Sequence, residues 1–335
     1  MIELFHFKKD VPFMSYGRIT TTISLVTFIF AVFFLITRPL NLSIEFTGGT
    51  VLEVRYPQAV NVEQVRTTVE ELNLGGLHKE VTVQALGTPR DVLIRLPNIP
   101  GQKSADLNNQ VMKRLAETAQ EDAQCKTLRV AGQPLPADLC VESRKVDYVG
   151  PAVGEELYTH GLTALLITCL GIIAYLAIRF EWRFAVSALI ANLHDVVIIL
   201  GFFAFFHWEF NLAVLAGVLA VLGYSVNESV VVFDRIRENF RKANMRGKSV
   251  TEIIDNAITS TMSRTFITHG CTEMMVLAML FFGGPALHNF ARALTIGIVF
   301  GIYSSVLVAS PLLLLFGVTR ENMVKPVKVK EEAVV

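Results

Sequence analysis

The sequence has little charge for its length and none of the short motifs that mark common enzymes. Only 18% of its 335 residues are Asp, Glu, Lys or Arg, whereas 52% are hydrophobic. It contains no H-E-x-x-H, no G-x-S-x-G and no His and Cys spacing typical of a zinc site. The segment MRGKS (245–249) lacks the first glycine of a phosphate-binding loop, because Lys242 stands at that position. We therefore expect no catalytic group, no metal and no organic cofactor, and the composition is that of a membrane protein.

Long apolar runs, by contrast, occur six times. Each has about 20 residues, which is enough for a helix to cross a hydrocarbon layer of about 30 Å. The first run follows a long N-terminal stretch and ends without a small-x-small cleavage site, so we predict a membrane helix there rather than a signal peptide. The sequence predicts a polytopic α-helical membrane protein with six transmembrane helices, at 19–37, 159–179, 184–206, 210–233, 264–283 and 292–316.

Lysines and arginines gather before the first run, between the second and third, after the fourth and after the sixth. If the six helices alternate in direction, all four groups fall on one side, which the positive-inside rule assigns to the cytoplasm. Both termini, 1–18 and 317–335, are therefore expected in the cytoplasm, together with the basic loop 234–262. Within that loop, Ser249 and Glu252 form a capping box that predicts the start of an amphipathic helix lying along the membrane surface.

The segment 41–158, between the first two runs, is polar enough to form one soluble domain of about 115 residues on the outer, periplasmic face. Alternating and helical patterns of apolar residues divide it into strands and helices. Their order is β-α-β-β-α-β, which is the ferredoxin-like arrangement. The strands are expected at 50–56, 81–86, 91–97 and 141–150, and the helices at 61–74 and near 104–121.

Only four cysteines occur, and two of them bracket an inserted loop in this outer segment. Cys125 and Cys140 flank the stretch KTLRVAGQPLPAD, between the second predicted helix and the last predicted strand. On the oxidising side of a bacterial membrane the two would form a disulfide, and two free thiols are the alternative. Cys169 and Cys271 lie inside apolar runs, where they read as small hydrophobic residues.

Ionisable residues inside the apolar runs are the candidate functional residues, because a charge in the membrane is costly and marks ion pathways or proton relays. At about 1.5 Å per residue, Glu228 lies roughly 10 Å inside the cytoplasmic boundary and Arg264 lies less than a turn inside it. An ion pair between them is therefore expected if the fourth and fifth helices pack together. A carboxyl that loses and regains such a cation would take up and release a proton, whereas a static polar clamp is the alternative. Asp195, nearer the middle of the membrane, is the third residue predicted for the proton relay, and His194, Asn227 and Glu273 are secondary polar candidates.

Six stretches, in order along nearly the whole chain, carry a family resemblance: IEFTGGT (44–50), VGPAVGEEL (149–157), HDV (194–196), GYSVNESVVVFDRIREN (223–239), SRTFITHG (263–270) and FGGPAL (282–287). Together they resemble the SecF family, whose members are the smaller subunit of the SecD–SecF protein-export complex in the resistance-nodulation-division superfamily. The resemblance implies a subunit of the bacterial inner membrane that pairs with SecD and acts beside the SecYEG translocon and YajC. Protons would be its coupling ion and a secreted preprotein polypeptide its substrate, with membrane lipid around it and no nucleic acid involved.

By motif, the family's membrane carboxylate falls on Glu228 and its essential arginine on Arg264. The family usually has Asp in place of Glu228, and Gly-Ile-Asp where this chain has Ser43, Ile44 and Glu45. A Glu keeps the titratable carboxyl but extends it by one methylene. A small-molecule proton antiporter of the same superfamily and a structural scaffold for the translocon are the alternative functions. The single outer domain of about 115 residues argues against the antiporter.

Overall fold

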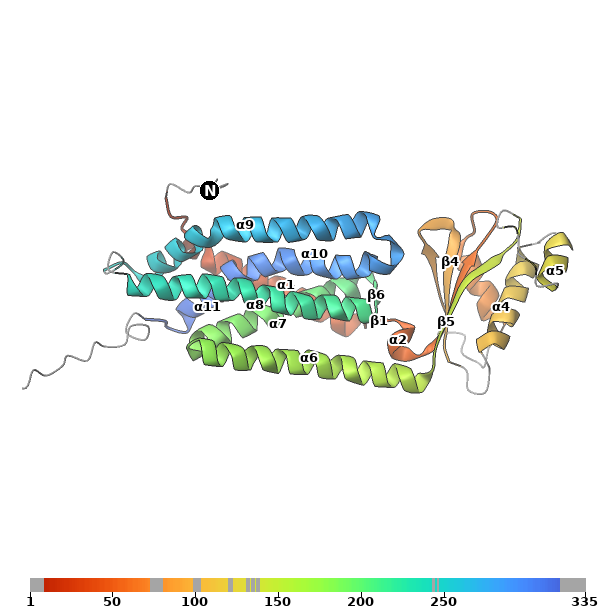
Figure 1. Cartoon of the computed structure of the whole chain (residues 1–335), viewed down its shortest axis with the longest axis horizontal. Coiled ribbons are helices and arrows are strands. Elements are labelled where there is room, and N and C mark those ends of the chain that lie inside the picture. Colours follow the sequence, from red (N-terminus) through yellow and green to blue (C-terminus); the bar gives the residue numbers. More distant parts are fainter. Residues whose placement is uncertain are drawn as a thin grey trace, which may run out of the picture. The chain divides into compact units, whose positions relative to one another are not determined.

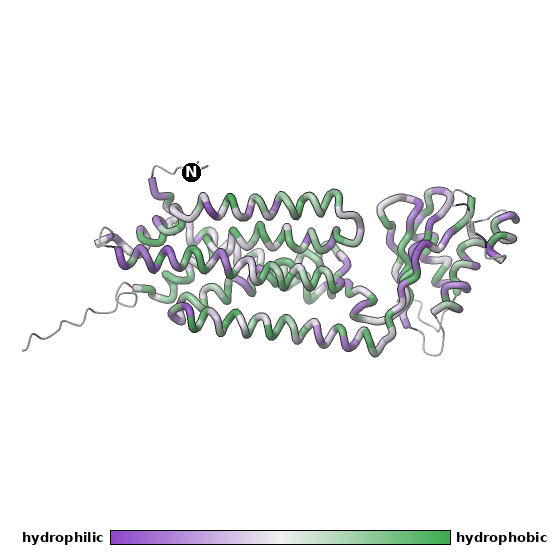
Figure 2. The backbone as a smooth tube through the Cα atoms, viewed as in Figure 1, coloured by the Kyte–Doolittle hydropathy of each residue, from purple (hydrophilic) through white to green (hydrophobic). Residues whose placement is uncertain are grey.

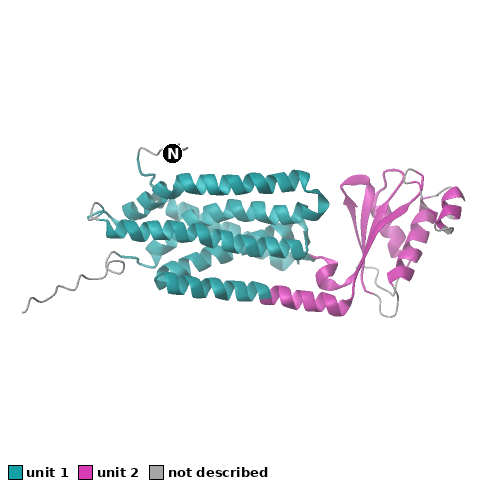
Figure 3. Ribbon diagram, in the orientation of Figure 1, with its two compact units in different colours: residues 1–41, 164–335 teal, residues 42–163 magenta. Residues whose placement is uncertain are grey.

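The computed structural model describes residues 9–72, 81–98, 104–119, 123–130, 133, 136, 139–242, 245 and 247–319. The chain divides into two compact units, one formed by residues 1–41 with 164–335 and the other by residues 42–163 (Figure 3). Most of the predicted cytoplasmic tail, from residue 320, lies outside the described residues, as does the start of the N-terminal segment, 1–8.

Within the described residues, six helices are long and apolar enough to cross a membrane, as the sequence predicts. They are largely hydrophobic along their length (Figure 2). A 3-10 turn at Phe13–Tyr16 precedes the first, and a short α11 (Ala309–Leu315) continues the last. The six are α1 (Gly17–Thr37), α6 (Pro151–Arg179), α7 (Trp182–Phe206), α8 (Leu212–Arg241), α9 (Val250–Phe282) and α10 (Gly284–Leu307) (Figure 1).

Three of these helices form the centre of the bundle. About half of the apolar stretch of α7, α8 and α10 is buried (56%, 50% and 50%), compared with 11%, 11% and 17% for α1, α6 and α9. Close approach of α8 and α10 requires a glycine, because a Cβ atom on Gly297 would lie 2.2 Å from Cγ2 of Val221. Any site built between α7, α8 and α10 is therefore shielded from lipid, whereas α1, α6 and α9 expose apolar faces.

The start of α9 differs from the prediction. The capping box is present: Glu252 N donates to Ser249 Oγ (3.3 Å), and Ser249 N donates to Glu252 Oε2 (2.8 Å). The helix that it begins, however, runs unbroken to Phe282 instead of lying separately on the membrane surface, because no Gly or Pro interrupts residues 250–264. Its apolar side chains, including Ile253 and Ile254, are buried in the main hydrophobic core of the bundle.

The second unit is built on a four-stranded antiparallel sheet with the order β3-β4-β2-β5. Its core lies between the sheet and two helices, where Leu52, Ile94, Val111 and Leu115 are almost fully buried. The order of elements is the predicted one, except that part of the expected insertion forms a further helix. The strands are β2 (Gly49–Arg55), β3 (Thr82–Leu86), β4 (Thr88–Leu96) and β5 (Glu142–Val149), and the helices are α2 (Ile44–Thr47), α3 (Val62–Glu70), α4 (Ser104–Thr118) and α5 (Ala123–Val130). Two further strands of two residues are not part of this sheet: β1 (Asn41–Leu42) lies at the boundary of the two units, and β6 (Glu209–Phe210) belongs to the first unit.

Two consecutive glycines turn the chain into β2. Gly48 and Gly49 have φ angles of +71° and +125°, in the region that side chains disfavour. A Cβ atom on Gly49 would also lie 2.5 Å from the carbonyl oxygen of Leu96, and one on Gly154 at the start of α6 would lie 2.7 Å from the nitrogen of Gly48. This turn therefore accepts only glycine, and it packs directly against the first turn of α6.

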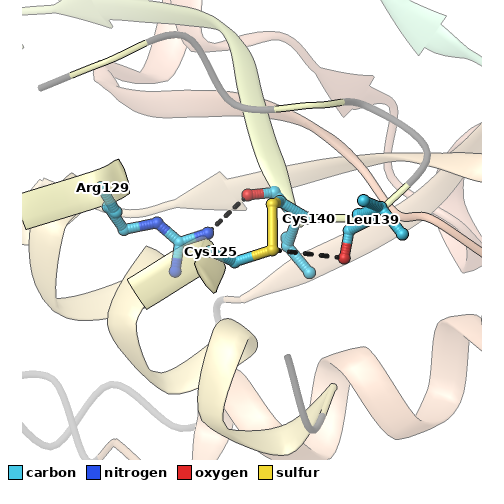
Figure 4. Close-up of a disulfide and its surroundings, with 5 residues drawn as sticks. Cys125, Arg129, Leu139 and Cys140 are labelled. Carbon is cyan, nitrogen blue, oxygen red and sulfur yellow. Dashed lines mark hydrogen bonds between the residues drawn. A yellow bond between two sulfur atoms is a disulfide. The ribbon is translucent and has the colours of Figure 1, made fainter. Parts of the chain in front are cut away.

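A disulfide joins the additional helix, α5, to the segment just before the last strand, β5. The sulfur atoms of Cys125 on α5 and Cys140 are 2.08 Å apart, and both residues are buried (Figure 4). Beside the bridge, Arg129 Nη2 donates to the carbonyl oxygen of Val141 at 2.6 Å. The bridge and this hydrogen bond both fasten α5 to the chain that leads into β5.

Candidate functional site

Asp195 is the centre of a buried polar cluster formed by four helices. The carboxylate, 1% exposed, comes from α7. Its Oδ2 atom accepts hydrogen bonds from Ser225 Oγ of α8 (2.8 Å) and Ser304 Oγ of α10 (2.7 Å), and its Oδ1 atom lies 3.2 Å from His194 Nδ1. On the far side of that ring, His194 Nε2 lies 2.6 Å from Ser24 Oγ of α1. We call these five residues the Asp195 cluster.

The chemistry of the Asp195 cluster suits proton exchange. Hydroxyl groups both donate and accept hydrogen bonds, and an imidazole can carry its proton on either nitrogen. A continuous series of contacts therefore runs from Ser24 through both ring nitrogens of His194 to the carboxylate. Within the described residues, no lysine or arginine forms a salt bridge with Asp195, so the groups that compensate a negative charge there are neutral hydroxyls and a titratable ring.

A second buried carboxylate, Glu228 of α8, faces α9. The hydroxyl of Thr265 donates to its Oε1 atom, and His269 Nε2 lies 3.4 Å from its Oε2 atom. Tyr224 packs its ring edge-on against the imidazole, with ring centroids 4.7 Å apart. His269 Nδ1 is buried and has no hydrogen-bond partner in the described part of the chain. We call Tyr224, Glu228, Thr265 and His269 the Glu228 cluster.

Helix periodicity explains how both clusters are assembled. Residues four apart lie on one face of a helix, so Tyr224 and Glu228 face α9 while Thr265 and His269 face α8. Ser225 of the Asp195 cluster precedes Glu228 by three residues, which is about 4.5 Å along the axis of α8. Glu228 therefore lies about one turn of α8 from the serine that binds Asp195. Among the residues that the structure describes, no group of three or more His, Cys, Asp or Glu side chains is placed to hold a metal ion.

The expected ion pair between Glu228 and Arg264 does not form. The side chain of Arg264 is exposed, and no salt bridge joins it to Glu228 in the described residues. The face of α9 that meets α8 is occupied by Thr265 and His269, and Arg264 is rotated by about 100° from Thr265, its next neighbour along the helix. Histidine and threonine therefore take the place that the sequence analysis gave to arginine.

The two remaining candidates lie outside both clusters. Asn227 is exposed on α8, although it is adjacent to Glu228 in sequence. Glu273 is half-buried on α9 and faces Thr295 of α10. Neither side chain contributes to the contacts around Asp195 or Glu228.

Sequence reasoning missed most partners of the two carboxylates. Ser24, Ser225 and Ser304 lie on three different helices, and a serine in an apolar helix has the same appearance whether it packs or binds. His269 did carry a signal: it stands in an apolar run, four residues after Thr265. A four-residue spacing of polar residues on a helix that faces a buried carboxylate predicts the observed contact.

Two family descriptions match this chain. Residues 136–319 match the family described as protein export membrane protein SecD/SecF, C-terminal, and this range contains α6 to α11 with the Glu228 cluster and all of the Asp195 cluster except Ser24. Residues 33–60 match the SecD/SecF GG motif, which here contains the Gly48–Gly49 turn.

Curated relatives agree with these matches. The chain is 38% identical to a protein translocase subunit SecF of Vibrio alginolyticus over 99% of this chain and 98% of that protein. It is 35% identical to one of Escherichia coli O157:H7 over 99% of this chain and 95% of that protein.

Solved structures agree as well. A crystal structure of SecDF from a Thermus species, called a translocon-associated membrane protein, superposes with a TM-score of 0.76 at 32% identity. SecDF in a super-membrane-facing form gives 0.64 at 33%. The chain covers 94% and 93% of its own length in these superpositions but spans only 39% of each SecDF chain. The chain therefore belongs to the SecD/SecF family of protein export membrane proteins, as a SecF-type accessory subunit of Sec-dependent export.

Proposed function

We propose that the Asp195 and Glu228 clusters form a proton relay that couples proton flow across the bacterial inner membrane to export. The observation that carries this proposal is that each buried carboxylate faces an imidazole: Asp195 faces His194 and Glu228 faces His269. Such pairs, held away from water between helices, can bind and release protons without leaving a strong fixed cation unpaired. Protons are then the coupling ion, and no organic cofactor is needed.

In this relay a proton enters one ring nitrogen of His194 and leaves from the other. A proton reaches Nε2 through the Ser24 hydroxyl, which accepts a proton from water on the entry side as it gives its own to the ring. Nδ1 meanwhile gives its proton to the Asp195 carboxylate, so the hydroxyl and the ring both end neutral and one proton has moved. Ser225 connects this cluster to the turn of α8 that carries Glu228. Glu228 and His269 are the second station, and a shift of α9 against α8 changes their separation.

Two stations also fit the energy that a conformational cycle needs. One proton crossing 100 mV supplies about 2.3 kcal/mol. Driving a two-state equilibrium from 1:99 to 99:1 requires about 5.5 kcal/mol. Two protons at that potential supply about 4.6 kcal/mol, so the remainder comes from a larger gradient or from binding of the polypeptide.

Arg264 gives the exposed face of α9 a role in partner binding. An arginine on a membrane helix needs an anionic or hydrated partner, and around it α9 exposes large apolar side chains such as Phe266, Ile267 and Met274. We assign this face to contact with SecD. The matched region makes up only 39% of the Thermus SecDF chain, so that chain has a large further part that could face α9. SecYEG, YajC and the preprotein complete the set of partners that the family resemblance implies.

The unit of residues 42–163 is, in this proposal, a ferredoxin-like domain in the periplasm that acts on the emerging polypeptide. Its strand order β3-β4-β2-β5 and its β-α-β-β-α-β core support the fold assignment. The Cys125–Cys140 disulfide supports an oxidising compartment. With the unit in the periplasm after the first of six membrane helices, we propose that both termini lie in the cytoplasm.

The relay is tested with Glu228→Gln and Asp195→Asn in the full chain, assembled with its native partners in sealed membrane vesicles. Both substitutions keep the size and polarity of the side chain but remove the titratable group. We expect assembly of the complex with loss of the export stimulation that an imposed proton gradient gives. Asn227→Ala, at the exposed position beside Glu228, is the matched control and should export normally.

The outcomes separate the three functions. Gradient-dependent export that persists in both variants would refute the relay, and assembly without any effect of either variant would favour the scaffold. Proton-driven efflux of a small molecule, lost in the same variants while export is unchanged, would favour the antiporter.

A further inference from the structure

One end of the bundle carries a charged cavity that belongs to neither cluster. A cavity of about 370 Å³ lies between the last residue of α6 and the end of α8. On α8 its lining residues follow the spacing i, i+3, i+4, i+7 and i+8, so a single helix face supplies them. The lining consists of Arg179 from α6 with Asp234, Arg237, Glu238, Arg241 and Lys242 from α8 and the residue after it.

Both carboxylates in this cavity are already engaged by cations. Asp234 accepts from Arg179 Nη2 at 2.6 and 2.8 Å, and Arg237 Nη1 lies 3.4 Å from Asp234 Oδ1. Glu238 is bonded by Arg235 (2.8 Å) and by Lys242 (3.0 Å). The four cations and two carboxylates that line the cavity leave a net charge of +2, so the cavity has anion-binding capacity to spare.

Two guanidinium groups are held in place at the cavity. The guanidinium groups of Arg179 and Arg237 both lie over the ring of Phe180, with their central carbons 5.0 and 5.3 Å from its centroid. Arg237 Nη1 also donates to the carbonyl oxygen of Arg179 at 3.3 Å. Arg241, one turn further along α8, is exposed and has no salt bridge within the described residues. Planar guanidinium groups arranged in this way suit the oxygens of a phosphate.

The surroundings of the cavity indicate where that phosphate comes from. Ile178, the residue before Arg179 on α6, is 88% exposed, and Trp182, three residues after Arg179 at the start of α7, is 57% exposed. Exposed apolar residues meet lipid chains, and tryptophan is enriched at the level of lipid headgroups. Basic pockets beside membrane helices are known to hold anionic headgroups. We infer that this cavity binds the phosphodiester headgroup of an anionic phospholipid, with its acyl chains along α6.

The test uses the full-length purified protein in neutral detergent, with native mass spectrometry to count bound lipid. Phosphatidylglycerol and phosphatidylcholine of identical acyl chains are the two probes. The variants are Arg241→Gln and the pair Arg237→Gln/Arg241→Gln. The matched control is Arg18→Gln/Lys248→Gln, which removes two exposed cations at the same end of the bundle but outside the cavity. Thermal melting without lipid shows that each variant is folded.

We expect the wild-type protein to retain phosphatidylglycerol in preference to phosphatidylcholine. Each cation removed from the cavity should weaken phosphatidylglycerol binding about fivefold, equivalent to about 1 kcal/mol, so the pair loses about 25-fold. The control pair should change binding by less than about twofold. The proposal is overturned if the wild type shows no preference, or if the control pair weakens binding as much as the cavity pair.

A further arm distinguishes a lipid from a soluble phosphate. Inorganic phosphate is added to the same samples at its cellular concentration. Retention of phosphatidylglycerol in its presence supports the lipid site. Complete displacement, with phosphate binding that the cavity variants abolish, would instead identify a soluble anion as the occupant and overturn the lipid assignment.

Discussion

His269 Nε2 lies 3.4 Å from Glu228 Oε2, and the two residues are 2% and 5% exposed. The contact joins α8 to α9, at the place where the estimated depths of Glu228 and Arg264 led us to expect an arginine beside the carboxylate. A histidine in that place can change its own protonation, whereas an arginine cannot. The pair is therefore able to exchange a proton internally as well as with its surroundings.

His269→Ala should reduce gradient-dependent export to nearly the level of Glu228→Gln, because it removes the base that faces the carboxylate. If the two residues act as one unit, the double variant will be no worse than either single variant. Export stimulation in membrane vesicles measures both effects. His160→Ala, at an exposed position on α6, is the control. Losses that multiply in the double variant would show that the residues act independently.

Ser225→Ala and Ser304→Ala should each destabilise the bundle by about 1.5–3 kcal/mol, because each removes a hydrogen bond to the buried Asp195 carboxylate. Thermal unfolding in detergent measures the loss. Ser187→Ala is the matched control, since this buried serine of α7 has no hydrogen-bond partner in the described residues. Equal effects of all three substitutions would indicate that packing, not the carboxylate contact, sets the cost.

Gly49→Ala should destabilise the unit of residues 42–163 by at least about 3 kcal/mol. The added Cβ would lie 2.5 Å from the backbone oxygen of Leu96 at a φ of +125°. Gly87→Ala also places a side chain at positive φ (+72°), but nothing lies within 4 Å of its Cβ, so only about 1–2 kcal/mol should be lost. Limited proteolysis of the full chain compares the two. Similar protease resistance in both variants would contradict the steric argument.

Asp91 gives the same unit a dependence on acid. Arg55 donates two hydrogen bonds to its carboxylate (2.7 and 2.8 Å), and Thr88 donates a third, which lowers the pKa of Asp91 from 3.8 to about 2. Because the folded pKa is the lower one, the stabilisation is complete above pH 3.8 and is lost as the pH falls through about 2. Arg55 is 28% exposed, so solvent screening leaves about 1–2 kcal/mol.

The check is the unfolding midpoint of the full chain, measured from neutral pH down to pH about 2. Asp91→Asn should flatten the acid part of this profile, and Arg55→Gln should do so as well. Glu63→Gln, which removes an exposed carboxylate of α3, should leave the profile unchanged. An unaltered acid slope in Asp91→Asn would assign the acid sensitivity to other groups.

Thiol labelling distinguishes the four cysteines. In denaturant without reductant, only Cys169 and Cys271 should react, and Cys125 and Cys140 should react after reduction. Replacing both bridged cysteines by serine should cost about 3 kcal/mol, the value for a closed loop of this length. The measurement is mass spectrometry of the labelled chain. Labelling of all four without reductant would contradict the disulfide.

Features set by local composition and residue spacing were predicted from the sequence, whereas features set by how the helices pack against one another were not. Membrane helices such as α7 and the Ser249 capping box depend on local composition and spacing, so they were predicted. Whether Arg264 or His269 is the partner of Glu228 depends on how α9 is rotated about its axis relative to α8. The sequence of α9 alone does not determine that rotation. The continuity of α9 was missed for a related reason: an apolar stripe has the same pattern whether it lies on lipid or on a protein core.

The unbroken course of α9 has a mechanical consequence. Its 33 residues extend about 50 Å, well beyond a hydrocarbon layer of about 30 Å. The capped first turn and the turn that carries His269 belong to one rod without a proline or a glycine between them. At its near end this rod is also fastened to the segment before α1, because Met14 N donates to Asp255 and Val11 N donates to Thr259. If α9 tilts when Glu228 gains or loses a proton, the first turns of α9 move with it. The N-terminal segment, which is hydrogen-bonded to those turns, is then displaced as well.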